Sequence, residues 1–174
     1  MLDVAVSYNR YKFLGHEFLT WLWFVMENRP ETLNKVDAEL VSLEVGNRMV
    51  LENNRDDRVE SVTIKGDQAG LEEGLLSLKK GAVVTELKLI YKAGDNDWHF
   101  SLKGESLNLS SLKPPQTAAT ENKEEIEGAV LEKVYLYEKV FVLVENLYKT
   151  FIRLRISEDW QKDIVPSIRR WLKS

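Results

Sequence analysis

The sequence predicts an α+β domain with a mainly antiparallel sheet, and three observations carry this prediction. Apolar side chains recur every three or four residues from Phe13 to Val25, which indicates a helix. Between Val36 and Leu102 most apolar side chains alternate with polar ones, which indicates consecutive strands. The helical spacing returns from Glu124 to Ile156. Because 174 residues suffice for a normal hydrophobic core, we expect a single domain over 1–174.

The segment FLGHEFLTWLWF, from Phe13 to Phe24, gathers five large aromatic rings near the start of the chain. The predicted helix ends near Asn28 to Pro30 and has one apolar side. Trp23 and Phe24 fall outside that side, so the helix is expected to be central and to contact apolar partners on more than one side. Because such rings concentrate binding energy at protein surfaces, these two are predicted to form a protein interface. The predicted core side consists of Leu14, Phe18, Trp21, Leu22 and Val25.

Five or six strands with one intervening helix are expected next. VDAELVSLEV and RMVLE alternate on either side of Gly46-Asn47, which predicts a hairpin with a two-residue turn. RVESVTIK predicts a third antiparallel strand. A helix from Gln68 to Lys80 follows, with Asp67 as its cap and Gly81 past its end. AVVTELKLIY and WHFSL predict a second hairpin, and a sixth strand is expected at Leu107 to Leu109.

The C-terminal third is predicted to be helical. Residues 110–123 contain paired prolines and no apolar period, so we expect a flexible surface connection between the sheet and the helices. Glu124 to Ile156 predicts one long helix. A short terminal helix follows from Asp159 to Leu172, which Pro166 should end or kink. The long helix either crosses the sheet or leaves an apolar surface for a second copy of the chain to cover.

The composition excludes several classes of site. Without cysteine there is no disulfide, no thiolate nucleophile and no cysteine-based metal site. The sequence has no glycine-rich phosphate loop and no Gly-x-Ser-x-Gly turn, and we expect no cofactor. The first residues do not resemble a signal peptide, and no apolar stretch reaches the roughly 20 residues of a membrane span. We therefore expect a cytoplasmic protein without a membrane partner.

Two short motifs resemble parts of metal sites. His16-Glu17 begins like the zinc motif His-Glu-x-x-His, but Thr20 stands at the second histidine position and His99 lies far along the chain. A polar pair near a helix start is the simpler interpretation. Glu86-x-Lys88 is an arrangement by which Mg²⁺-dependent nucleases hold the cation and orient a water, although a salt-bridged strand face has the same pattern. The second acidic residue that a nuclease needs would be Asp56, Asp57 or Glu60.

Charge is distributed unevenly along the chain. The formal net charge is −4, yet Lys149 to Ser174 contains seven basic and three acidic residues. Basic residues interleaved with Trp160 and Trp171 are typical of a surface that binds phosphates and stacks bases. The alternative is the solvated face of an amphipathic helix. The predicted nucleic-acid-binding residues are Arg153, Arg155, Lys162, Arg169, Arg170 and Lys173.

FLGHEFLTWLWF resembles a segment of larger bacterial proteins related to the recombination-associated protein RdgC. There the pattern Phe-Leu-Gly-Arg-Glu-Phe-Leu-x-Trp-Leu-Trp occurs in an additional C-terminal region. His16 stands in place of that arginine, and the DNA-binding ring of RdgC has no counterpart before Tyr11. The resemblance implies a bacterial or phage cytoplasmic protein that serves DNA transactions as a partner-binding or accessory module. No site residue follows from it.

Three functions compete. The leading hypothesis is a non-catalytic DNA-associated or accessory protein, linked to recombination, whose basic C-terminal segment contacts phosphates. The second is a protein-interaction module or homodimeric scaffold that binds no nucleic acid and uses Trp23 and Phe24 or the long helix. The third is a Mg²⁺-dependent nuclease centred on Glu86 and Lys88.

Overall fold

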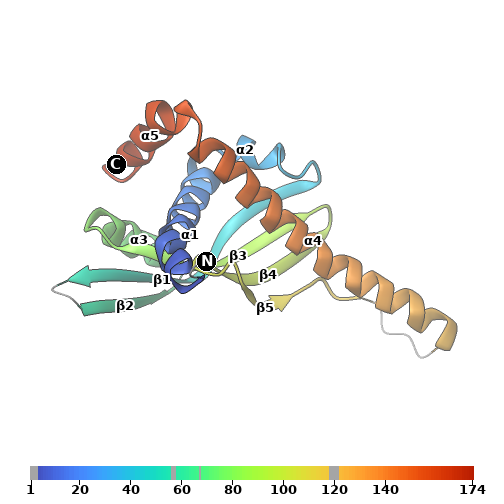
Figure 1. The fold of residues 1–174 in the computed structure, drawn as a ribbon. Coiled ribbons are helices and arrows are strands. Elements are labelled where there is room, and N and C mark those ends of the chain that lie inside the picture. The colour runs from blue at the N-terminus through green and yellow to red at the C-terminus, as the bar shows by residue number, and fades with distance from the viewer. Residues whose placement is uncertain (1–3, 56–57, 67, 118–121) are drawn as a thin grey trace.

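The computed structural model describes residues 4–55, 58–66, 68–117 and 122–174, which form helices and one five-stranded sheet (Figure 1). The predicted α+β class is confirmed. Two of the predicted acidic nuclease residues, Asp56 and Asp57, and the predicted helix cap Asp67 lie outside the described residues. The elements are α1 (Val4–Asn28), α2 (Glu31–Asn34), β1 (Leu40–Arg55), β2 (Arg58–Lys65), α3 (Gln68–Lys79), β3 (Val83–Ala93), β4 (Asn96–Lys103), β5 (Leu109–Lys113), α4 (Lys123–Arg155), a π-helical turn (Trp160–Ile164) and α5 (Val165–Trp171).

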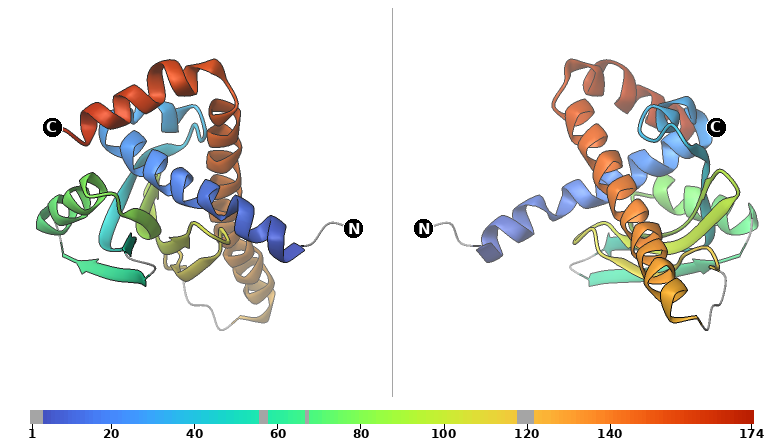
Figure 2. Two further views of the ribbon diagram at one scale, coloured as in Figure 1. Left: turned by 60° about the vertical axis from the view of Figure 1, so that its left-hand side comes forward. Right: turned by 90° about the vertical axis from the view of Figure 1, so that its right-hand side faces the viewer.

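The strands are antiparallel and lie in the order β2-β1-β3-β4-β5. Figures 1 and 2 show α1, α3 and α4 on one side of this sheet. The strand side chains facing them are buried, as at Leu87 and Leu89 of β3, whereas Glu86 and Lys88 face the other way. The alternation predicted for β3 therefore separates a core side from an open side.

The hairpin predicted at Gly46-Asn47 is wrong. β1 runs through both residues as one strand and pairs with β3 from Leu40 to Glu52. Four steps along β1, from Val45 to Met49, lie opposite two steps along β3, so the glycine and asparagine form a bulge. Beyond the bulge β1 also pairs with β2. A strand that pairs on both sides of the bulge outweighs the local turn preference of this dipeptide, because the residues before and after it gain ladder hydrogen bonds.

The aromatic helix α1 is central, as predicted, although it starts earlier, at Val4. Phe18, Trp21 and Leu22 are completely buried. Gly15 brings α1 close to the chain after β4, because a Cβ on Gly15 would lie 1.8 Å from the carbonyl oxygen of Gly104. The glycine in FLGHEFLTWLWF is therefore a packing requirement.

The connection predicted over 110–123 is shorter than expected. β5 begins at Leu109 and continues to Lys113, so the last strand extends beyond the predicted Leu107 to Leu109. The small polar residues that suggested a loop are part of β5, where their backbone pairs with β4. Residues 118–121, inside the predicted connection, lie outside the described part of the chain.

The helical C-terminal third also follows the prediction, with one local difference. Pro166 lies in the first turn of α5 and does not end the helical path. The chain widens just before it, where the Val165 N–H bonds to the Trp160 carbonyl oxygen in a π-helical turn. Because a first-turn residue needs no N–H, the proline is accommodated. None of the helices in the described ranges is long and apolar enough to cross a membrane.

Candidate functional site: an uncovered face of the long helix

Trp23 and Phe24, predicted as an exposed interface, are buried, with exposed fractions of 0% and 2%. The reason is that α5 folds back over α1. The Trp171 ring lies 5.4 Å from the Trp23 ring and 5.7 Å from the Phe24 ring between centroids, edge-on to both. The irregular side of α1 is thus covered by the C-terminal helix of the same chain, and the prediction of an interface at these rings is corrected.

Base stacking on Trp160 and Trp171 is likewise corrected, because both indoles are buried. The Trp160 ring stacks edge-on against Phe151, with 5.5 Å between centroids. The Trp171 Nε1–H donates to Glu27 Oε2 over 3.0 Å, and the Trp23 Nε1–H donates to the other oxygen of the same carboxylate over 2.5 Å. Trp160 and Trp171 therefore attach the C-terminal segment to the core and to α1.

An ion pair between Arg29 and Asp163 at the surface also attaches the C-terminal segment to α1. Arg29 donates from Nη1 and Nη2 to the two Asp163 oxygens over 2.7 and 2.8 Å, and its guanidinium lies over the Phe24 ring. The Arg29 hydrogen bonds lower the pKa of Asp163 to about 2, and a further bond from Ser167 acts in the same direction. The pair joins the end of α1 to the turn before α5.

Three of the six predicted nucleic-acid-binding residues make contacts within the chain. Arg155 donates from Nε to Glu17 Oε2 over 2.6 Å and lies over the Trp160 ring. Lys162 pairs with Glu158 one helical turn away, and Arg170 donates to the Ser167 hydroxyl over 2.9 Å. These contacts weaken the case for a single basic surface that includes all six residues. The remaining three, Arg153, Arg169 and Lys173, are exposed.

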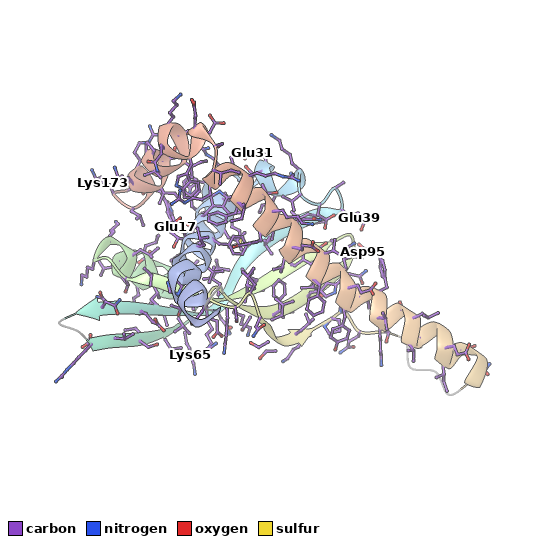
Figure 3. The ribbon with its side chains drawn as sticks, viewed as in Figure 1. Glu17, Glu31, Glu39, Lys65, Asp95 and Lys173 are labelled. Atoms are coloured by element: carbon purple, nitrogen blue, oxygen red, sulfur yellow. The ribbon has the colours of Figure 1, made fainter. Side chains whose placement is uncertain are left out.

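Arg169 and Lys173 lie with Lys79 around a shallow groove between α5 and α3, beside Leu172. Figure 3 shows Lys173 at the end of α5, on the side of α3. No ion pair joins these three cations to a carboxylate of the described residues. Sequence reasoning missed Lys79 because it lies far from the C-terminal segment, and the two meet through the fold. We call Lys79, Arg169 and Lys173 the basic cluster.

His16 and Glu17 line a pocket of about 470 Å³ between α1, β3 and the C-terminal segment, together with Arg155. The Thr20 hydroxyl, at the position of a second zinc ligand, donates to the His16 carbonyl oxygen over 3.0 Å. The Glu17 carboxylate accepts a hydrogen bond from Arg155, and this ion pair joins α1 to α4 across the pocket. The motif lies in the middle of α1 (Val4–Asn28), so its predicted place near a helix start is wrong, and the Glu17 carboxylate pairs with Arg155 of another helix.

The nuclease hypothesis gains no support at Glu86. The carboxylate is bound to Arg48 of the adjacent strand β1, and Lys88 donates to the Asn47 amide oxygen over 3.0 Å. Among the described residues no group of three acidic or histidine side chains is placed to hold a metal ion. Both side chains of the motif make the cross-strand polar contacts that the alternative interpretation expects.

The largest unexplained feature is the first half of α4. Figure 1 shows this half projecting from the body past β5. The first buried α4 side chain is Leu136, whose carbonyl oxygen accepts the Trp98 Nε1–H over 2.9 Å, and none of the described α4 side chains before it is buried. Five apolar side chains nevertheless recur here at spacings of four, four, three and four residues. They are Ile126 (43% exposed), Val130 (54%), Val134 (48%), Tyr137 (40%) and Phe141 (55%), and we call them the α4 stripe.

The same side of α4 is covered further along the helix. Tyr148 lies seven residues, or two helical turns, after Phe141, and Phe151 lies three residues after Tyr148, so both rings continue the line of the stripe. Phe18 of α1 contacts both rings, at centroid distances of 5.2 and 5.5 Å. One helical seam is therefore filled by another helix in its second half and open in its first half. The second half of α4 packs against the body, as the first alternative for the long helix expects, and the first half leaves an apolar surface, as the second expects; its covering by a second copy stays a prediction.

Scans of the chain against protein-family models and against curated proteins give no match.

Proposed function

We propose that this chain is a non-catalytic accessory protein that associates with a protein partner through the α4 stripe. The proposal rests on the row of five apolar side chains, each 40 to 55% exposed, which begins in the part of α4 before its first buried side chain, Leu136, and continues past it to Phe141. Single apolar residues on a surface need no explanation, but a contiguous row on a projecting helix is typical of a contact surface.

Folding alone does not account for this row. An isolated helix segment is marginal in water, and most helical stability in proteins comes from burial of an apolar face. Up to Tyr135 the described α4 side chains bury no such face. A partner that covers the stripe would supply the missing burial, and Tyr137 and Phe141 are residue types that concentrate binding energy.

Site-specific cross-linking in cells tests the proposal. A photoreactive amino acid replaces Val134, in the middle of the stripe, and in a control it replaces Glu132. Because two residues rotate a helix by about 200°, Glu132 points to the opposite side. We expect protein adducts from position 134 and far fewer from position 132. Equal yields at the two positions, or none at either, would contradict the proposal.

A second candidate function, contact with DNA, is favoured by the basic cluster. Lys79, Arg169 and Lys173 converge from two elements without a carboxylate partner among the described residues. Such convergence is the electrostatic arrangement that phosphate contacts need. The resemblance of FLGHEFLTWLWF to RdgC-related proteins supports a role beside DNA and stays a prediction from sequence.

Fluorescence anisotropy with duplex and single-stranded DNA across a salt series tests this second function. Phosphate contacts would make the logarithm of the affinity fall linearly with the logarithm of the salt concentration. Arg169→Glu/Lys173→Glu should weaken binding and flatten that slope. The control Lys65→Glu/Lys92→Glu changes the net charge equally, at exposed lysines of β2 and β3 that are not among the predicted binding residues. An equal loss in both double variants would show a general charge effect and no site at the basic cluster.

A further inference from the structure

We propose that the partner of the α4 stripe is a second copy of this chain, paired in parallel as a short two-stranded coiled coil. The inference rests on the proposed function and names its partner. Val130, Val134, Tyr137 and Phe141 alternate four- and three-residue steps, which is the a/d pattern of a heptad, with Val134 and Phe141 at a and Val130 and Tyr137 at d.

The flanking positions decide between parallel and antiparallel pairing. In this heptad Ile126 and Lys133 occupy g, and Leu131 and Glu138 occupy e. A parallel pair brings each g residue opposite the e residue five positions later in the other copy. Ile126 then meets Leu131, and Lys133 meets Glu138, so an apolar residue meets an apolar one and a cation meets an anion.

An antiparallel pair lacks this complementarity. It places g beside g and e beside e, so Lys133 has no acidic position opposite it and Glu138 faces other e positions. Within the segment 130–141 the e positions are Leu131 and Glu138, so Glu138 faces either an apolar side chain or the Glu138 of the other copy. Like charges that face one another disfavour the antiparallel orientation. The charges therefore favour a parallel pair.

The structure also limits the length of the pair. Glu127 occupies the a position before Val130, and two carboxylates facing each other there would end the apolar seam. Beyond Phe141 the seam is occupied by α1, through Phe18 on Tyr148. The paired segment is thus 130–141, with Ile126 and Leu131 at its edge.

The body of each copy leaves room for this arrangement. Leu136 and Val140, which attach α4 to the body, lie about a quarter turn round the helix from the centre of the stripe. Two copies related by a twofold axis along the seam therefore have their bodies on opposite sides of the pair. Figures 1 and 2 show the first turns of α4 projecting from the body.

Cross-linking of purified chain tests the register and direction. The chain has no native cysteine, so Val130→Cys or Tyr137→Cys introduces a unique thiol. A parallel pair places each residue beside its own copy, and both variants should form disulfide-linked dimers under mild oxidation. An antiparallel pair allows at most one of these positions to meet itself, since they lie about 10 Å apart along the helix. The control is Glu132→Cys, on the opposite side of the helix, for which we expect no dimer.

Charge reversal provides a second readout, the dimer dissociation constant from sedimentation velocity. Lys133→Glu and Glu138→Lys should each weaken dimerisation about ten-fold. Either change places two like charges opposite one another in both symmetry-related pairs of residues 133 and 138. The combined variant Lys133→Glu/Glu138→Lys should return to within about two-fold of the original value. Absence of this rescue would overturn the parallel pairing.

The outcomes separate the inference from the function on which it rests. A chain that stays monomeric, with cell adducts at position 134 that contain a different protein, would overturn self-pairing and leave the association function intact. A chain that stays monomeric and forms no adducts would overturn both. Dimers that cross-link at only one of the two cysteine positions would overturn the parallel direction alone.

Discussion

The contact between Gly15 and Gly104 makes a sharp stability prediction. α1 approaches the chain after β4 so closely that an ideal Cβ on Gly15 lies 1.8 Å from the Gly104 carbonyl oxygen and 2.3 Å from its carbonyl carbon. From the other side, a Cβ on Gly104 lies 2.6 Å from the Gly15 oxygen. We therefore expect Gly15→Ala to force the helix and the strand end apart.

The size of the effect follows from the geometry. An ordinary contact begins near 3.4 Å, so the two backbones must separate by about 1.6 Å. Overpacking of a well-packed core costs about 1 to 3 kcal/mol, and the upper end applies because the obstacle is backbone and no flexible side chain can yield. Alanine recovers about 1 kcal/mol through its better helix propensity. The expected net loss in the free energy of unfolding is therefore about 2 kcal/mol.

Denaturant unfolding monitored by tryptophan fluorescence measures this loss. The matched control is Gly128→Ala in α4, where a Cβ meets nothing within 4 Å. The control should leave the free energy of unfolding unchanged or raise it by up to about 1 kcal/mol. If Gly15→Ala unfolded at the same denaturant concentration as the original chain, the close approach of α1 to the Gly104 turn would be refuted.

Two further predictions concern attachments between elements. Because the pKa of Asp163 is lowered from 3.8 to about 2, the Arg29 pair stabilises the fold above pH 4 and this stabilisation is lost as the pH falls toward 2. Thermal unfolding between pH 5 and 2 should therefore show a shallower loss of stability in Asp163→Asn, and parallel curves for the two proteins would contradict the coupling. Trp98→Phe removes the hydrogen bond to the Leu136 carbonyl oxygen and should cost about 0.5 to 1.5 kcal/mol from that bond, plus a packing loss. Faster amide exchange in the middle of α4 would check it, and unchanged exchange would argue against this attachment.

The fold class could be predicted from the sequence because the spacing of apolar residues within each helix or strand is a local property of that element. The period of two placed Leu87 and Leu89 of β3 in the core, and the helical period placed Phe18 of α1 there, as the structure shows. The Gly46-Asn47 turn failed for a physical reason. A dipeptide that closes hairpins also fits a bulge, and the choice depends on whether a neighbouring strand continues past it, which local sequence does not contain.

The candidate sites depended more on tertiary contacts. Trp23 was predicted to be exposed because its position lies off the apolar side of α1, but Trp171, far away in sequence, covers it. Lys79 joins Arg169 only through the packing of α3 near α5. The open half of α4 was recognisable as one of two alternatives, and distinguishing them required knowing where the body ends, at Leu136.

Sedimentation equilibrium of three proteins tests whether the α4 stripe is a contact surface between two copies of the chain. They are the original chain, Phe141→Glu in the stripe and Ile156→Glu at a residue that is 80% exposed beyond the end of α4. We predict that the mass of the original chain and of Ile156→Glu rises from one copy to two with concentration, while Phe141→Glu stays at one copy. The same mass for all three proteins at every concentration would contradict the claim.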